Sequence, residues 1–183
     1  MGLRNRYKFN EEHTFFITTT CHKWLNLLFY GSAIEIIIDS LNFCSKKHPI
    51  HILGYVLMPN HIHLVIYAVR PKERSDFMRD FKKYTSAHIR RMVKENSSKL
   101  LKNIRFEYRK QSYKVWMDRF DEVYIKNRKM LERVLDYIHE NPLQKKWQIV
   151  ENPWDYPYSS AAYYHSGKTG LIELRHYHEY FPF

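Results

Sequence analysis

Hydrophobic positions along this chain switch several times between strand-like and helix-like spacing, and each switch delimits an expected element. Aromatic and β-branched residues favour a first strand over His13–Cys21. Apolar residues then recur three and four apart between positions 34 and 44, which predicts a helix that ends near Pro49. Ser32, with Glu35 three residues later, is placed to form a capping box where this helix begins.

Two short apolar runs follow, and the residues between them predict a hairpin. The runs are Ile50–Met58 and His61–Ala68, and a turn containing Pro59 and Asn60 separates them. Side chains alternate across a strand, so the imidazoles at positions 61 and 63 leave the same face of the second strand. Two imidazoles on one rigid strand suit the binding of a single divalent cation.

A pair of histidines two residues apart is weak evidence for a metal site by itself, because most strand histidines are half-buried polar residues with a hydrogen-bond partner. A second pair with this spacing, His176 and His178, stands in a charged and aromatic stretch near the C-terminus. That stretch has no clear strand pattern, and we expect a solvated tail there. The apolar surroundings of His61 and His63 make them the better candidates.

The second half of the chain predicts two more helices and a fourth strand. A helical pattern covers Lys72–Asn96, Ser97–Lys102 has the composition of a loop, and Tyr113–Met117 is the expected strand. Another helix begins at Asp121 or Asn127 and ends before the next proline, because the residue preceding proline disfavours helical angles. This order of elements predicts an α+β fold, a ferredoxin-like antiparallel sheet with helices on one face.

Charge points to the class of partner. Thirty Lys and Arg against nineteen Asp and Glu give a net charge of +11, and 16% of the residues are aromatic. A cationic surface with exposed rings is typical of nucleic-acid-binding proteins. The basic residues of the helix at 72–96 and its approach are the candidates for DNA contact, although a solvated cationic helix face is an equally ordinary interpretation. These candidates are Arg70, Lys72, Arg74, Arg79, Lys82, Lys83, Arg90 and Arg91.

Length and composition exclude several other classes. The 183 residues suffice for one domain with a real core, and the two cysteines, Cys21 and Cys44, form no disulfide framework or metal motif. The chain has no run of eighteen apolar residues, so we expect no membrane partner and a cytoplasmic protein.

The last expected helix carries a second group of candidate residues. It contains Tyr137 and Asn141, which lie four residues apart and therefore on one face. A tyrosine at the rim of a buried stripe is most often a core residue with a solvated hydroxyl, and an asparagine before proline usually marks a helix end. The combination with His61 and His63 gives both residues another interpretation.

Three motifs together resemble one family. They are Gly-Tyr-Val-Leu-Met-Pro-Asn-His-Ile-His from Gly54, Tyr-Ile-His-Glu-Asn-Pro from Tyr137, and Pro-Trp-Asp-Tyr-Pro-Tyr-Ser-Ser from Pro153. This set is similar to the single-tyrosine HUH transposases, and most similar to their REP-associated tyrosine transposase branch. The resemblance covers most of residues 1–164, expected to be one domain of the HUH endonuclease fold. Residues 165–183 are expected to be a tail of unknown role.

The resemblance implies a site and a reaction. His61, His63 and Asn141 would hold a divalent ion, Mg²⁺ or Mn²⁺, and Tyr137 would be the nucleophile. Such enzymes cut single-stranded DNA near a hairpin, a REP-like or insertion-sequence end, keep the 5′ end as a phosphotyrosine and rejoin strands. They work as monomers or homodimers. A divalent ion suits the anionic phosphate, and two imidazoles with an amide favour manganese or another transition ion over magnesium.

Three other functions stay open at this point. One is a replication or conjugation nickase with the same histidine pair, which usually carries further domains. Another is a protein that binds DNA hairpins without cutting them, which would need the basic helix but not Tyr137. The third is a metal-dependent phosphodiesterase that uses water, in which Tyr137 would have no chemical role.

Overall fold

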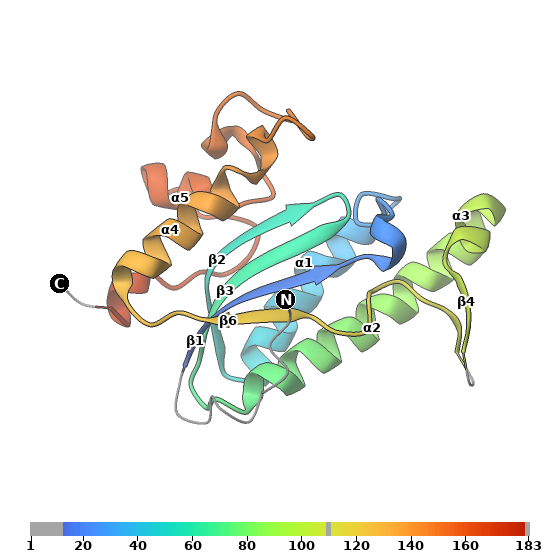
Figure 1. Cartoon of the computed structure of the whole chain (residues 1–183), viewed down its shortest axis with the longest axis horizontal. Coiled ribbons are helices and arrows are strands. Elements are labelled where there is room, and N and C mark those ends of the chain that lie inside the picture. The colour runs from blue at the N-terminus through green and yellow to red at the C-terminus, as the bar shows by residue number, and fades with distance from the viewer. Residues whose placement is uncertain (1–12, 109–110, 182–183) are drawn as a thin grey trace.

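A four-stranded antiparallel sheet in the order β2-β3-β1-β6 is the centre of the computed structural model, which describes residues 13–108 and 111–181 (Figure 1). The strands are β1 (Thr14–Thr20), β2 (Ile50–Met58), β3 (His61–Ala68) and β6 (Asp121–Tyr124). The apolar first strand and the hairpin around Pro59 lie where the sequence predicts them. The predicted class, an α+β fold with an antiparallel sheet, is confirmed.

The fourth strand of the sheet is not the predicted one. Strand β6 pairs with β1 through Phe15↔Tyr124, whereas Tyr113–Met117 lies mostly outside the sheet. Instead β5 (Gln111–Tyr113) pairs with β4 (Arg105–Tyr108) in a separate hairpin, and Trp116 makes one isolated bridge to Cys21. The prediction failed because β6 is a four-residue edge strand with two acidic residues, so its apolar alternation is too short to recognise.

Two helices cover one face of the sheet, as predicted. These are α1 (Ala33–Lys47) and α2 (Glu73–Asn96), which share a core with the β-strand residues that point toward them. The fully buried residues of this core include Phe15, Ile17, Leu64, Phe77 and Phe81. The predicted capping box is absent, because Ser32 makes no capping hydrogen bond and its hydroxyl donates to Met92 Sδ instead. After α2, the short helix α3 (Ser98–Asn103) replaces the predicted loop.

Helix α4 (Arg128–His139) packs on the opposite face, so the expectation that every helix would share one face is wrong for this element (Figure 1). Its apolar stripe, Leu131, Leu135 and Ile138, packs with Val56 and Val65. Asn127 rather than Asp121 begins the helix, since its side chain accepts a hydrogen bond from the Met130 amide at 2.9 Å.

Gly54 permits the close approach of α4 to β2. A Cβ atom at this position would lie 2.4 Å from Leu135 Cδ2 and 3.4 Å from Ile138 Cδ1. Any side chain here would push the leucine away, and with it the helix that carries Tyr137. The first residue of the motif that begins at Gly54 therefore sets the distance between α4 and the strands.

The segment after α4 covers the free edge of β2. It contains the turns η3 (Asn141–Leu143) and η4 (Pro153–Asp155), helix α5 (Ala161–Ser166) and the turn η5 (Tyr177–Glu179). The Leu57 amide donates to the Tyr158 carbonyl, and the Arg175 amide donates to the Ile52 carbonyl. The predicted tail is thus packed along an edge strand that would otherwise expose unpaired backbone groups. Within the described ranges, none of the helices is long and apolar enough to cross a membrane.

Candidate active site

The residues singled out by the sequence converge on the face of the sheet that α4 covers. His61 and His63 point from β3 toward that helix, and their ring centroids lie 4.7 Å apart. The ring of Tyr137, from α4, lies 5.5 Å from that of His63. Both imidazoles are buried, whereas the tyrosine is 47% exposed. A half-exposed phenol beside a buried imidazole pair can meet a substrate that arrives from solvent.

Each imidazole is held by a hydrogen bond at Nδ1. In His61 this atom lies 2.7 Å from Asn60 Oδ1, and in His63 it lies 2.8 Å from Thr18 Oγ1. Protein metal ligands characteristically use one ring nitrogen for such an anchor and present the other to the ion. Nε2 is therefore the nitrogen that each ring has left for a ligand. The sequence indicates Asn60 only as a turn residue and carries no signal for Thr18.

Asn141 completes the group from the first position of η3, two residues beyond the end of α4, whereas the sequence predicts it within the helix itself. It is buried, and its Nδ2 donates to the Tyr137 carbonyl at 3.1 Å. The two residues, four apart in the sequence, are therefore in direct contact. Its side chain also forms a hydrogen bond with His61. Because the amide nitrogen donates to Tyr137, the amide oxygen is the atom that faces the His61 ring, and a bound ion would take the place of that hydrogen bond.

This donor set fits one divalent transition ion. Among the described residues no group of three or more His, Cys, Asp or Glu side chains could hold a metal, so a site here would consist of two imidazoles and one amide oxygen. Imidazole suits manganese-to-zinc ions better than magnesium, which prefers a shell of oxygen ligands. His61, His63 and Asn141 are thus the residues that could hold the ion.

Burial keeps both imidazoles neutral, which is the form that binds metal. Desolvation lowers the pKa of His61 to about 4; the Asn141 hydrogen bond opposes this shift and the charge of Lys146 adds to it. Desolvation, followed by the charge of the neighbouring His61, lowers the pKa of His63 to about 3. Near neutral pH, protons therefore do not compete for these nitrogens.

A third buried histidine, His139, contacts a serine instead of lying in the candidate metal site. His139 Nε2 lies 2.8 Å from Ser160 Oγ, and the same oxygen accepts a hydrogen bond from the Tyr55 amide at 2.9 Å. Burial lowers the pKa of His139 to about 4. This chain of contacts joins the end of α4 to β2 and directs the His139 ring toward Ser160. It also explains the serine pair at the end of the third motif.

Tyr124, the nearest tyrosine before Tyr137 in the sequence, lies on the opposite face of the sheet from this site. A helix beginning at Asp121 would place Tyr124 in its first turn, but the residue lies in β6, and its ring packs 6.0 Å from that of Phe15. Phe15 belongs to the core beneath α1 and α2. Tyr124 therefore lies on the other face of the sheet and cannot share a metal with Asn141.

The second histidine pair is not in a solvated tail, contrary to expectation. His176 and His178 have ring centroids 4.3 Å apart and are half-buried at the turn η5. His176 stacks on Tyr177 at 4.8 Å, and its Nδ1 accepts a hydrogen bond from the His178 amide. This pair belongs to an aromatic cluster through which the C-terminal segment packs on the face of the sheet that α4 covers.

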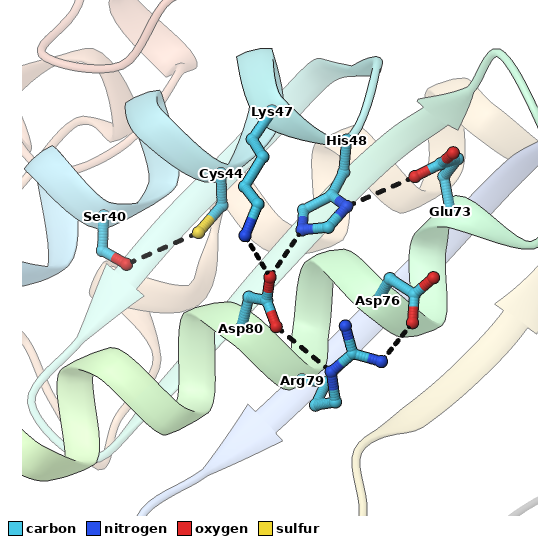
Figure 2. Close-up of polar contacts among 8 residues, drawn as sticks. All are labelled: Ser40, Cys44, Lys47, His48, Glu73, Asp76, Arg79 and Asp80. Atoms are coloured by element: carbon cyan, nitrogen blue, oxygen red, sulfur yellow. Dashed lines mark hydrogen bonds and ion pairs between the residues drawn. The ribbon is translucent and has the colours of Figure 1, made fainter.

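Many of the basic residues predicted to contact DNA have partners within the protein. Arg79 lies between Asp76 and Asp80, and Asp80 also binds Lys47 and His48 of the α1 end (Figure 2). Arg70 pairs with Glu73 at 2.7 Å and Arg91 with Glu95 at 3.0 Å. These surface pairs leave the groups accessible to solvent, but they reduce the local excess of positive charge.

Two of the predicted DNA contacts need correction. Arg74 is buried, pairs with Glu122 at 3.1 Å and lies over the Phe15 ring, so it cannot reach a phosphate. Lys82 donates to the Met117 carbonyl at 2.6 Å and holds the segment before β6. Of the eight candidates, Lys72, Lys83 and Arg90 form no ion pair with the described residues. Helix α2 also lies on the face of the sheet opposite the histidines, which the sequence could not show.

Comparisons with known proteins identify the family of this chain. A family model described as "Transposase IS200 like" matches residues 13–141. A protein named as a REP-associated tyrosine transposase, from Haemophilus influenzae, is 31% identical over 115 residues, which is 63% of this chain and 61% of that protein. The chain therefore aligns with less than two thirds of this relative's length.

A solved structure of a REP-associated tyrosine transposase bound to a REP hairpin has the same fold. The match has a TM-score of 0.62 and 20% identity, and it covers 90% of this chain and 86% of the other. The family model spans the hairpin with the histidine pair and ends at Asn141, so it includes every residue of the site. The chain belongs to the family of IS200-like transposases.

Proposed function

We propose that the protein is a metal-dependent transposase that cleaves and rejoins single-stranded DNA near a hairpin through a 5′-phosphotyrosine at Tyr137. The observation that carries this proposal is the half-exposed Tyr137 ring 5.5 Å from His63, beside two imidazoles and the Asn141 amide, which together supply three donor atoms for a metal. A phosphodiester placed over the histidines would lie within reach of the phenol oxygen.

The chain's own residues perform the transfer as follows. Tyr137 Oη attacks the phosphorus, the bond from phosphorus to the 3′ oxygen breaks, and the products are a 5′-phosphotyrosine and a free 3′ hydroxyl. The exposed phenol can pass its proton to water, and rejoining reverses each step without ATP. When bound, a divalent ion supplies Lewis-acid stabilisation of the charge that develops on the phosphate. His61, His63 and Asn141 would hold that ion.

A DNA hairpin is the proposed partner. The relative with the same fold was solved with a REP hairpin, and this chain has a net charge of +11. Lys72, Lys83 and Arg90 on or beside α2 are the remaining proposed phosphate contacts, because they form no ion pair with the described part of the chain. Their position opposite the histidines suits a hairpin stem that lies apart from the strand being cut.

The test is a covalent-adduct assay with 3′-labelled DNA. Hairpins with randomised single-stranded flanks are incubated with the protein and Mn²⁺, and the products are separated on a denaturing gel. The wild type should form a slowly migrating labelled adduct, and EDTA should prevent it. Tyr137→Phe removes one oxygen and should eliminate cleavage and adduct, whereas Tyr124→Phe, the matched control, should retain both.

The same gel separates the alternatives. Cleavage by Tyr137→Phe without an adduct would show that water is the nucleophile and that the protein is a phosphodiesterase. If the wild type gave neither adduct nor cleavage product on this gel but shifted the hairpin on a native gel, it would be a protein that binds DNA without cutting it.

A further inference from the structure

We propose that Trp24 and Trp147 form a base-stacking subsite beside the histidines, which holds an unpaired nucleotide next to the scissile phosphate. This inference rests on the proposed function, since it assigns a position to the single strand. None of the sequence motifs contains either tryptophan. Both come from loops that the structure brings to one side of His61.

The two indoles approach His61 from two distant parts of the chain. The Trp24 ring, in the turn η2 (His22–Trp24), lies 6.3 Å from the imidazole, and the Trp147 ring, after η3, lies 6.2 Å from it. Trp24 is 55% exposed, and Trp147 is half-buried. An indole exposed beside a polar site is a stacking surface for any unpaired base, because every base has a π face.

Lys146 makes a cation–π contact with each of the two rings. Its Nζ lies 5.6 Å from the Trp24 ring centroid and 5.0 Å from that of Trp147. It forms no ion pair with the residues that the structure describes, and its positive charge contributes to the lowered pKa of His61. Its ammonium is therefore available to the phosphate that links a stacked base to its neighbour. The subsite thus offers both groups that single strands require, a stacking ring and a cation.

The backbone around both tryptophans is strained. Among the described residues other than glycine, only Lys23, Trp24 and Gln148 have positive φ angles, at 55°, 57° and 45°. All three lie at or next to one of the two indoles. Such conformations are unfavourable for residues with a side chain and concentrate where a ligand must be held. Here they occur beside two rings that both lie near His61.

Trp24 is tied to the turn that carries the first histidine. Asn60 Nδ2 donates to the Trp24 carbonyl at 3.2 Å, while Asn60 Oδ1 is the anchor of His61. One amide thus sets the position of an imidazole and of an indole. A base stacked on Trp24 would be placed relative to the metal ligand rather than on a free loop.

The other two tryptophans show what a structural role looks like in this protein. Trp116 is buried, and its Nε1 donates to Thr85 Oγ1 at 2.9 Å. Trp154 is 42% exposed but stacks on His165 at 4.0 Å, and within the described part of the chain its ring makes no contact with His61 or His63. Trp154 is therefore the matched control, an exposed indole without the proposed subsite.

The test measures the affinity of a fluorescein-labelled hairpin with a single-stranded thymidine flank for protein carrying Tyr137→Phe, which prevents cleavage. Adding Trp24→Ala or Trp147→Ala should weaken binding by about fivefold to 100-fold each, the range found for stacking of one base. Trp154→Ala should change binding by less than twofold. Trp24→Tyr should recover most of the loss, because a phenol ring also stacks.

An abasic scan of the flank identifies stacking rather than folding as the cause. One abasic position should weaken binding to the Tyr137→Phe protein by a similar factor and should have little effect once Trp24 or Trp147 is alanine. Equal affinities with and without the indoles, or equal losses on a hairpin that lacks the flank, would overturn the proposal. The assay requires no cleavage, so failure of the tyrosine chemistry would show in the adduct gel and not here.

Discussion

The protein contains two histidine pairs with the same spacing, one on a regular strand and the other at a 3₁₀ turn. His61 and His63 lie on a regular strand, so the alternation of the sheet puts both rings on one face. His176 and His178 lie in a single 3₁₀ turn among tyrosines. The ring centroids are similarly close in the two pairs, at 4.7 Å and 4.3 Å. Closeness alone therefore does not distinguish a candidate metal site from an aromatic cluster.

The hydrogen bonds at Nδ1 make the difference. Oxygens of Asn60 and Thr18 engage this atom in the strand pair, which leaves Nε2 of each ring for a ligand. In the C-terminal pair the Nδ1 lone pair of His176 accepts the backbone amide of His178, a contact that shapes the turn. Anchoring of Nδ1 by a side-chain oxygen prepares an imidazole for a metal. Three predictions follow from this contrast, in order of expected effect.

Removing the strand pair should have the largest effect. His61→Ala or His63→Ala should abolish Mn²⁺ binding in calorimetry and reduce adduct formation about a thousandfold or more, because metal stabilisation of a phosphate is worth several kcal/mol. His176→Ala and His178→Ala should leave both measurements within about twofold. If the C-terminal variants lost metal binding and the strand variants kept it, the two pairs would have been assigned the wrong way round.

Removing an anchor should have an intermediate effect. Thr18→Val keeps the shape of the side chain but loses the oxygen at His63 Nδ1, and Mn²⁺ affinity should fall about 10- to 100-fold. The control is Thr19→Val on the opposite face, whose Oγ1 is buried without a partner among the described residues. That variant should bind Mn²⁺ like the wild type. Equal affinities for the two variants would contradict the anchoring role of Thr18.

The smallest expected effect is on stability in acid without metal. The pKa values of His61 and His63 are about 4 and about 3 in the folded protein, below the ordinary 6.5. Below pH 6.5 the unfolded chain therefore takes up protons first, so the stability present above pH 6.5 declines as the pH falls toward 4. Between pH 7 and pH 5, each imidazole should lower the free energy of unfolding by roughly 1–2 kcal/mol.

Thermal melting in EDTA at the two pH values measures this loss. The double variant His61→Gln, His63→Gln should show a smaller decrease in melting temperature, whereas His176→Gln, His178→Gln should change it little. His139 should contribute the same residual slope to every variant, since its pKa is also lowered to about 4. An unchanged slope in the first double variant would show that its histidines are not buried as described.

The sequence predicts the elements that have a long and regular pattern. The hairpin with His61 and His63, helices α1 and α2, and the spacing of Tyr137 and Asn141 are all found as expected. Each depends on local periodicity or on two residues of one element. A four-residue edge strand such as β6 carries too little pattern for the same reasoning.

What the sequence could not supply are relations between distant residues. The anchor of His63 comes from β1, 45 positions earlier, and the contact of His139 is with Ser160. The face chosen by α4 also depends on the space left by Gly54. Arg74 looked like a phosphate contact because its partner, Glu122, lies in a strand that the pattern did not reveal. These contacts require the tertiary structure.

The most direct measurement for the tyrosine chemistry is mass spectrometry of the trapped protein–DNA adduct after trypsin and nuclease digestion. Cleavage after Arg133 and Lys145 yields the peptide Val134–Lys145, which contains a single tyrosine, Tyr137. The proposed reaction predicts that this peptide carries the mass of the added nucleotide. A nucleotide on another peptide, such as the one with Tyr124 or Tyr177, or no modified peptide from a reaction that cuts DNA, would contradict it.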